Sequence, residues 1–279
     1  MMRWIDKNKK KFRKRGRYLV EKFLEQSWNK DLNRYINCDF SSLKKEKKLE
    51  RLLLGQQRGF CCYCMRRISF KQHTTLEHIL PHHPQSMDDV KWYLQTYPRL
   101  RHFVTYYHID EHPCQRINVP PYPHFCAYDN LVVSCDGSIP DPSRPNIILP
   151  SKLHLCCNNA RGNVRIRPLF FIRRISKDIR YEIDGELTYD EAKYGETIQA
   201  LRLENDTLKL MRRTWANIAK YNYYQVDDVR KAISDKVLRN NILSDSHVPM
   251  RDINNLKTDI YWNTLYSYHW FYGYFKKHL

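Results

Sequence analysis

The placement of the cysteines constrains this chain more than any other feature. Cys61 and Cys64 form a C-x-x-C pair, and two thiolates at that spacing can reach one ion from a single turn. Cys135 and Cys157 offer a second pair, which would complete a closed tetrahedral zinc site with four cysteine ligands. The second pair is stretched, because 21 residues separate its members, so the intervening chain would have to loop out. Cys156 is an alternative to Cys157 as the fourth ligand.

The nine cysteines also allow other interpretations. An odd number is a poor basis for a disulfide framework. A thioredoxin-like redox pair needs a βαβ pattern around the C-x-x-C motif, and none surrounds it. Buried reduced thiols without a ligand role remain an alternative for all of them, and Cys38, Cys62, Cys114 and Cys126 are best interpreted in this way. A second metal site built from Cys114, Cys126 and neighbouring histidines is a further alternative.

The charge of the chain points to a polyanionic partner. Lysine and arginine number 48 against 30 acidic residues, which gives a net charge of +18. Residues 1–17 hold nine basic side chains and one acid, so this segment is predicted to be a basic arm that supplies +8. The rest of the chain still carries +10 (18 − 8), so the excess is spread. Nucleic acid and an acidic membrane surface both fit this charge, as does a solubility charge without a partner.

The order of apolar and polar residues predicts no membrane span, since no apolar run reaches the length of a spanning helix. The charged N-terminus is followed by no apolar h-region, so a secretory signal peptide is not expected. We therefore expect a cytoplasmic protein in a reducing compartment, which agrees with metal binding by the cysteines.

The periodicity of the apolar residues divides the chain into three predicted parts. Residues 1–55 would hold the basic arm and two amphipathic helices, over 18–35 and 42–58. Residues 56–168 would form the core, in which a turn leads into one strand, the segment TTLEHILP forms the returning strand, and residues 81–126 are a surface insertion. Residues 169–279 would begin with a β-hairpin made by LFFIRRI and IRYEI and closed by Asp184-Gly185. Helices through 208–218 and 226–237 would follow. An aromatic tail, buried or docked on a partner, would end the chain.

Polar residues at the ends of these elements suggest hydrolytic chemistry. His78 follows Glu77 at the end of a predicted strand, and a neutral imidazole is suited to take a proton from water. Glu77 and Asn158 offer oxygen ligands to a hard divalent ion, which would stabilise charge on a phosphoryl group. Asn130 could hold the imidazole through its Nδ1 side. A base, an ion and an orienting amide are together what phosphodiester hydrolysis requires.

These motifs also carry a resemblance. The segments that carry it are QQRGFCCYC, TTLEHILPH, YDNLVVSC and CCNNARGN, and in this order they resemble an HNH endonuclease of the ββα-metal type. The resemblance implies that His78 is the general base, Asn130 the central asparagine, and Asn158 the last residue of an H-N-N variant. It further implies that Glu77 binds the catalytic Mg²⁺ or Mn²⁺, while Arg161 contacts phosphate and the four cysteines hold a structural zinc ion. The expected fold is α+β, a ββα-metal core stapled by zinc between mainly helical flanks.

A closer resemblance covers roughly residues 40–80 and 127–215. The segments LERLLLGQQRGFCCYC, CNNARGN and TIQALRLENDTLKLMRR are similar to retron-associated and Septu-type HNH proteins. This implies a bacterial antiviral effector acting beside an ABC-type ATPase and, in retron systems, a reverse transcriptase with its DNA. DNA is the expected substrate, with RNA or tRNA as an alternative, and no membrane partner is implied. A non-catalytic zinc-stapled nucleic-acid-binding subunit is the hypothesis from a different class.

Overall fold

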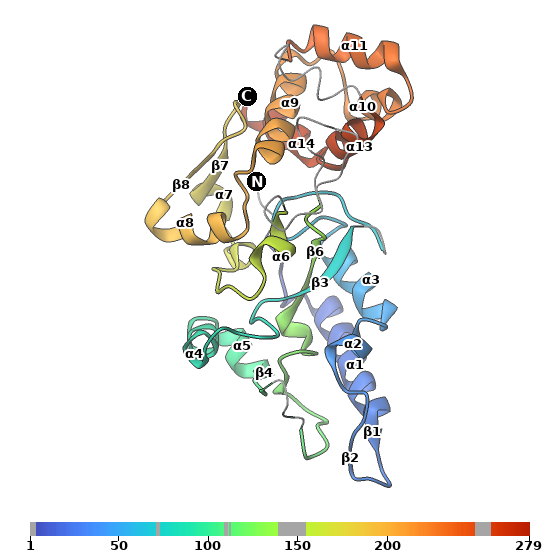
Figure 1. Ribbon diagram of the computed structural model, residues 1–279, viewed down its shortest axis with the longest axis vertical. Helices are drawn as coiled ribbons and strands as arrows, with labels where there is room; N and C mark the ends of the chain where they lie inside the picture. Colours follow the sequence, from blue (N-terminus) through green and yellow to red (C-terminus); the bar gives the residue numbers. More distant parts are fainter. Residues whose placement is uncertain (1–3, 71–72, 109–110, 112, 139–154, 249–257) are drawn as a thin grey trace.

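The computed structural model describes residues 4–70, 73–108, 111, 113–138, 155–248 and 258–279. It is 50% helical and 11% strand, a mixture of helices and small sheets that agrees with the predicted α+β class. Figure 1 shows an elongated molecule, with the N-terminal helices toward one end, the C-terminal helices at the other, and the strands β3 and β6 between them. Buried hydrophobic residues form one connected cluster from Ile5 to Phe275. The predicted division at residues 55 and 168 stays a prediction.

The first helix, α1 (Lys10–Ser27), begins well before the predicted start at residue 18. Its buried face continues toward the N-terminus through Gly16, which lies against the ring of Tyr128 in the short helix η1 (Tyr128–Asn130). A Cβ atom at Gly16 would lie 2.2 Å from that ring, so only glycine permits this approach. The prediction of a basic arm over residues 1–17 is therefore wrong for residues 10–17, whose charges lie on a packed helix.

Lys7 ties the segment before α1 into the interior. Its side chain is 2% exposed, and its Nζ donates hydrogen bonds to the carbonyl oxygens of Tyr128, at 3.2 Å, and of Leu131. Ile5 N also donates to Phe170 O at 2.8 Å. Burial lowers the pKa of Lys7 to about 7, because a charged ammonium loses its hydration there. The described part of the predicted arm is thus a structural segment.

Two short strands and two helices follow α1. The strands β1 (Trp28–Asn29) and β2 (Arg34–Tyr35) pair antiparallel. The single predicted helix over 42–58 is divided into α2 (Phe40–Leu43) and α3 (Lys47–Gln56). Asp39 begins α2 by accepting a hydrogen bond from Ser42 N at 2.6 Å. The leucines of α3 pack it against α1 and β6, so the N-terminal helices support the central strands.

The central sheet consists of β3 (Thr74–His78) and β6 (Leu131–Cys135), which run antiparallel. Thr74 pairs with Cys135 at one end and His78 with Leu131 at the other. The short helix α6 (Cys157–Arg161) contacts β6, so the order is strand, strand, helix (Figure 1). The strand expected just before β3 is absent from the described residues there, which form a turn with a single bridge between Phe60 and Arg67.

Residues 81–126 are more ordered than expected. They contain the helices α4 (Met87–Thr96) and α5 (Pro98–Phe103) and the parallel strand pair β4 (Val104–Thr105) and β5 (Tyr122–Pro123). Val90, Tyr93 and Leu100 are buried in the common core. The prediction of a surface insertion without regular structure is wrong here, because a proline starts a new helix at residue 98 and leaves each helix too short for a sustained period.

The predicted β-hairpin is present with different strands. β7 (Ile179–Tyr181) pairs antiparallel with β8 (Leu187–Tyr189), and the turn contains Asp184 and Gly185 as expected, the glycine with φ +91°. The segment LFFIRRI is not a strand, because it forms the short helix η3 (Leu169–Phe171) and leads into α7 (Ile175–Asp178). The turn signal was therefore more informative than the apolar run before it.

The C-terminal third is helical, with α8 (Glu191–Ala200), α9 (Asp206–Tyr221), α10 (Val226–Ala232), α11 (Lys236–Asp245), α13 (Asp259–Ser267) and α14 (Trp270–His278). The helix predicted through residues 208–218 is confirmed as α9. The pattern over 226–237 spans two helices, since Asp235 caps a new one through Leu238 N. The aromatic tail is buried as predicted, with α14 packed on α9. Within the described ranges, no helix has the length and apolar character needed to cross a bilayer.

The buried Lys7 predicts a pH-dependent stability. Its pKa is about 7 in the folded chain and about 10.5 when exposed, so the unfolded state binds more protons between these values and stability rises with pH across this interval. We expect the unfolding free energy of wild type minus that of Lys7→Met to rise by on the order of 1 kcal/mol per pH unit above pH 7. Urea unfolding of both proteins between pH 7 and 9 measures this, with the exposed Lys10→Met as control. A pH-independent difference would contradict it.

Candidate functional site

The four predicted zinc ligands meet in the folded chain. The Sγ atoms of Cys61, Cys64, Cys135 and Cys157 all lie within 4.8 Å of one another and are buried. Cys61 Sγ is 3.8 Å from Cys157 Sγ, and Cys64 Sγ is 3.7 Å from Cys135 Sγ. A tetrahedral zinc ion with bonds of about 2.3 Å requires sulfur–sulfur distances of roughly 3.8 Å. The cluster can therefore hold a metal such as zinc.

Local backbone geometry builds the first half of this cluster. Cys61 N donates to Arg66 O at 2.8 Å, which closes the turn that carries both cysteines. Cys62 N donates to Val133 O at 3.2 Å and attaches the turn to β6. Tyr63 N points at Cys61 Sγ at 3.4 Å, which is the direction that stabilises a thiolate. Burial raises the pKa of the Cys64 thiol, so ionised sulfurs at this position require a cation beside them.

The second half closes through a close approach of two backbone segments. Cys156 N donates to Gly137 O at 3.1 Å, although the two residues are separated by a long stretch of chain. Gly137 has φ +74°, and a Cβ atom there would lie 2.0 Å from Cys156 O. Only glycine fits this position. The contact brings Cys135, at the end of β6, next to Cys157, at the start of α6, as the stretched pair requires. Residues 139–151 of the predicted loop lie outside the described residues.

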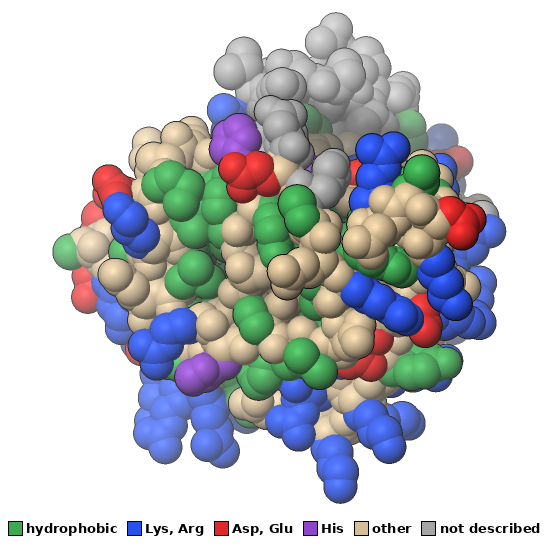
Figure 2. All heavy atoms as spheres, turned by 90° about the horizontal axis from the view of Figure 1, so that it is seen from below, with side chains coloured by type: hydrophobic (Ala, Val, Ile, Leu, Met, Phe, Trp, Pro, Cys, Tyr) green, Lys and Arg blue, Asp and Glu red, His purple; other side chains and the backbone are tan. Residues whose placement is uncertain are grey.

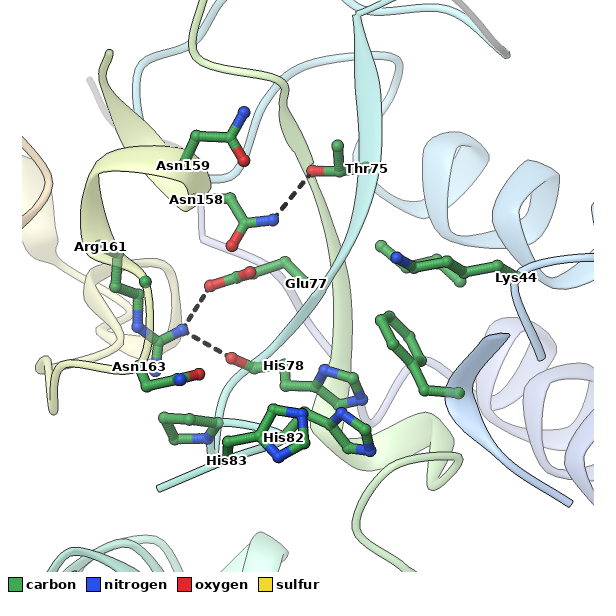
Figure 3. Close-up of a pocket in the computed structure, with 14 residues that line it drawn as sticks. Lys44, Thr75, Glu77, His78, His82, His83, Asn158, Asn159, Arg161 and Asn163 are labelled. Carbon is green, nitrogen blue, oxygen red and sulfur yellow. Dashed lines mark hydrogen bonds and ion pairs between the residues drawn. The ribbon is translucent and has the colours of Figure 1, made fainter. Parts of the chain in front are cut away.

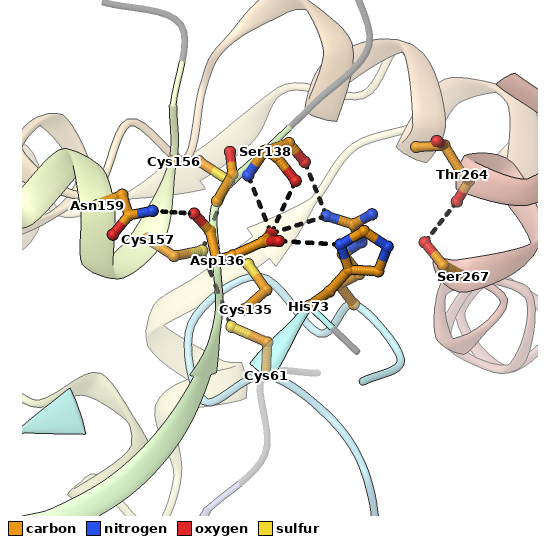
Figure 4. A network of polar contacts seen from close by, with 12 residues as sticks. Cys61, His73, Cys135, Asp136, Ser138, Cys156, Cys157, Asn159, Thr264 and Ser267 are labelled. Carbon is orange, nitrogen blue, oxygen red and sulfur yellow. Dashed lines mark hydrogen bonds and ion pairs between the residues drawn. The ribbon is translucent and has the colours of Figure 1, made fainter. Parts of the chain in front are cut away.

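The structure separates the two candidates for the fourth ligand. Cys157 belongs to the four-sulfur group, whereas Cys156 is the N-cap residue of α6 and its thiol donates toward Gly137 O at 3.7 Å. Cys156 Sγ is still only 3.6 Å from Cys157 Sγ, so it borders the cluster (Figure 4). Among the described residues, Cys114 and Cys126 belong to no group that could hold a metal ion, whereas the four cysteines do.

An ionic network that the sequence did not indicate fixes the residue after Cys135. Asp136 pairs with His73 at 2.9 Å and with Arg66 at 3.6 Å, and it accepts hydrogen bonds from Ser138 N and Oγ at 3.1 and 2.8 Å (Figure 4). Although burial opposes ionisation, these donors lower the pKa of Asp136 to about 2. The ionised carboxylate holds the chain in place where it leaves the cluster. His73 carried no assignment from sequence, because its partner is 63 residues away.

A pocket with a cavity volume of about 490 Å³ lies beside β3 and α6 (Figure 3). Its polar lining includes Lys44, Glu77, His78, His82, Asn158 and Arg161. Four of the predicted site residues, Glu77, His78, Asn158 and Arg161, thus line one cavity. Lys44 and the ring of Phe40 come from the N-terminal segment, which the sequence motifs did not include in the site.

His78 has a defined proton arrangement. Its Nε2 lies 2.9 Å from the carbonyl oxygen of Phe125, which can only accept, so Nε2 carries the proton and Nδ1 carries the lone pair. Its ring stacks on His82 with centroids 5.3 Å apart and packs against Phe40 at 4.4 Å. Burial lowers the pKa of His78 well below its ordinary value, which keeps the imidazole neutral. The ring is thus neutral with an unprotonated Nδ1, which is the form that a general base needs before it accepts a proton, although the lowered pKa weakens it as a proton acceptor.

Asn130 does not hold the imidazole as predicted. Its Oδ1 accepts from Leu80 N at 2.7 Å, and its Nδ2 donates to Leu80 O at 3.0 Å and to His124 O at 2.8 Å. The amide therefore joins the turn after β3 to the residue before Phe125. Its effect on His78 is indirect, through the position of the Phe125 carbonyl, and the prediction of a direct contact is wrong.

Arg161 is fully enclosed and has a structural role. It is 1% exposed, and its NH1 and NH2 groups donate to His78 O and to Ile79 O, the latter at 2.8 Å. The same guanidinium forms a buried ion pair with Glu77. The prediction that Arg161 contacts phosphate is therefore wrong, because its donors are directed to protein acceptors.

The same ion pair changes the role expected for Glu77. Its Oε1 accepts hydrogen bonds from Tyr63 Oη at 2.8 Å and from Arg161. The positive partner of the carboxylate is therefore a guanidinium group and not the divalent ion that was expected. Burial raises the pKa of Glu77, and Arg161 opposes this rise. Asn158 Nδ2 donates to Thr75 Oγ1 at 3.2 Å. With its carboxylate already paired, Glu77 does not fit as a ligand for Mg²⁺ or Mn²⁺ in this arrangement.

Zinc binding at the four cysteines can be tested directly. In Cys64→Ser we expect substoichiometric zinc and a lower unfolding midpoint, because the binding free energy of such a site is part of the folding free energy. A loss of several kcal/mol would lower the midpoint by roughly 10 °C or more in a domain of this size. Cys156→Ser is the matched control and should keep one equivalent of zinc. Elemental analysis and thermal unfolding measure both, and a full equivalent of zinc in Cys64→Ser would contradict the assignment.

Comparisons with protein-family models, with curated proteins and with solved structures found no match to this chain.

Proposed function

We propose that this protein is an endonuclease that hydrolyses phosphodiester bonds of nucleic acid, with DNA as the first substrate and His78 as the general base. The observation that carries the proposal is the hydrogen bond from His78 Nε2 to the Phe125 carbonyl. It fixes the ring and leaves the lone pair on Nδ1, to which no described residue donates a hydrogen bond. His78 lines the pocket, and on this proposal a water molecule there gives its proton to Nδ1.

The proposed step follows from this arrangement. The oxygen of a water molecule attacks phosphorus while its proton moves to His78 Nδ1. The bond between phosphorus and the 3′ oxygen breaks, and that oxygen takes a proton from solvent. The products carry 5′-phosphate and 3′-hydroxyl ends. The proton that His78 already carries stays on Nε2. Its hydrogen bond to the Phe125 carbonyl stabilises the imidazolium that forms.

The surface charge supports a polyanionic substrate. The net charge is +18, and in Figure 2 lysine and arginine side chains outnumber acidic ones over the face seen from below. Because α1 is a packed helix, its basic residues project from a fixed backbone, unlike those of a loose arm. RNA, including tRNA, is the alternative substrate, since hydrolysis by water neither needs nor forbids a 2′ hydroxyl.

We also propose that the chain is an HNH nuclease of the retron-associated or Septu type. The order β3, β6, α6 and the four-cysteine group support this, since both are expected of a zinc-stapled ββα-metal core. On this proposal the protein is a cytoplasmic antiviral effector that works with an ABC-type ATPase, and in a retron with its reverse transcriptase and DNA. Mg²⁺ or Mn²⁺ as a second cofactor belongs to the same proposal, but the pairing of Glu77 with Arg161 argues against a direct ligand role for Glu77.

A second candidate function has its own support. The ion pair between Glu77 and Arg161 occupies the carboxylate expected to bind a catalytic ion, which favours a zinc-stapled nucleic-acid-binding subunit without catalysis as the second candidate. His78 is only 5% exposed, which agrees with a packed histidine as well as with a screened base. The two functions differ in one measurable property, which is cleavage that depends on His78.

His78→Ala should separate them. General-base catalysis contributes about 10²–10⁴-fold, so we expect cleavage to fall by at least this factor while the protein stays folded, with zinc content and nucleic-acid affinity close to wild type. Labelled DNA and RNA are incubated with each protein in Mg²⁺, in Mn²⁺ and without either ion. The exposed His102→Ala is the matched control and should cleave like wild type.

Two results would contradict the nuclease proposal. One is cleavage by His78→Ala at the wild-type rate. The other is binding without cleavage by wild type under every metal condition, also when its genomic neighbour is added, and this result would favour the binding subunit.

A further inference from the structure

Two basic side chains line the pocket, one lysine and one arginine, and they differ in the groups with which they interact. These are Lys44 and Arg161. Arg161 donates to Glu77 and to the backbone oxygens of residues 78 and 79, and it is 1% exposed. Its charge is balanced by the carboxylate of Glu77. An anion that enters the pocket therefore finds the positive charge of Arg161 already compensated.

Lys44 differs from Arg161 in its exposure, its partners and the compensation of its charge. It is exposed, it follows directly on α2, and no described residue forms an ion pair with it. Its Nζ lies 4.5 Å from the centroid of the Phe40 ring, which packs on His78 with centroids 4.4 Å apart. The ammonium group thus lies over the phenyl ring, and the phenyl ring in turn contacts the tilted imidazole. Figure 3 shows Lys44 reaching toward the cavity from the side opposite Asn158 and Arg161.

The backbone at Lys44 is held in place by the residues before it. Asp39 caps α2 through Ser42 N at 2.6 Å, and Leu43, the residue before Lys44, is completely buried. The carboxylate of Asp39 is engaged in this cap, and hydrogen bonds from the backbone of α2 lower its pKa. On the opposite wall, Asn158 and Asn163 bring amide groups and no charge. The pocket therefore combines one uncompensated cation with neutral hydrogen-bonding groups, a combination that suits a monoanionic phosphodiester.

We propose that Lys44 binds the phosphate of a nucleic-acid backbone in this pocket, beside His78. The proposal deepens the proposed function and rests on it, because it names the group that holds the substrate near the base. It also assigns part of the substrate site to the N-terminal segment before residue 56. The strand–strand–helix unit alone would lack its substrate cation.

Binding to a labelled DNA duplex tests the proposal in the full-length, zinc-loaded protein. All variants carry His78→Ala, so that cleavage does not interfere. We expect Lys44→Gln to weaken binding by about tenfold, which is the range for a hydrogen bond to a charged group. The slope of log affinity against log salt should fall by about 1, since one phosphate contact is lost. Lys44→Arg should restore most of the affinity.

Lys48→Gln is the matched control, because it removes the same charge from an exposed position on α3 that does not line the pocket. Equal effects of Lys44→Gln and Lys48→Gln on affinity and slope would overturn the proposal, since they would show a dependence on net charge alone. In the His78-containing background, Lys44→Gln should raise KM more than it lowers kcat.

The two proposals can fail separately. If no cleavage occurs in any protein but Lys44→Gln alone weakens binding, the nuclease proposal fails and the phosphate site stands. If His78→Ala abolishes cleavage but Lys44→Gln binds like Lys48→Gln, the nuclease stands and the phosphate site fails.

Discussion

The meeting of four buried sulfur atoms determines the arrangement of the rest of the site. One pair comes from a turn attached to β6, and the other joins the end of β6 to the start of α6. Because β3 pairs with β6 over its whole length, Cys135 marks one end of the ladder and His78 the other. Four residue steps in a strand span roughly 13 Å. The cluster therefore fixes the strands and the helix without entering the pocket, and its role is to position groups that act at a distance.

The ion pair between Glu77 and Arg161 shows how burial changes the meaning of a motif. In the sequence, an acid beside a histidine at a strand end suggests a metal ligand, and the resemblance to HNH endonucleases implies a phosphate contact for the arginine just past the last expected ligand. In the fold, the two side chains neutralise each other, and the arginine also satisfies backbone oxygens after β3. Two buried charges are tolerated because each is paired and hydrogen-bonded. The consequence is a rigid wall behind His78 and a site whose positive charge has to come from elsewhere.

The sequence was most informative where the signal is local. The C-x-x-C turn, the helix α9 and the burial of the aromatic tail follow from spacing and periodicity, and all three are present. It was least informative where the deciding contact is distant. The charges of residues 1–17 suggested an arm, since nothing in that segment indicates that Lys7 donates to carbonyls about 120 residues away. Asn130 was assigned to the wrong neighbour for the same reason, because its partners lie on two separate turns.

The contact between Gly137 and Cys156 has a consequence for how such a protein can diversify. The chain leaves the cluster at Gly137 and returns to it at Cys156, and these two residues contact each other. The two ends of the intervening segment are therefore held in place by this contact and by the cluster. The cost of closing a flexible loop grows slowly with its length, about 0.6 kcal/mol for each doubling. Related sequences can therefore carry very different numbers of residues between these anchors while the sulfur atoms keep their places. A new recognition element could be grafted there without redesigning the wall formed by Glu77 and Arg161.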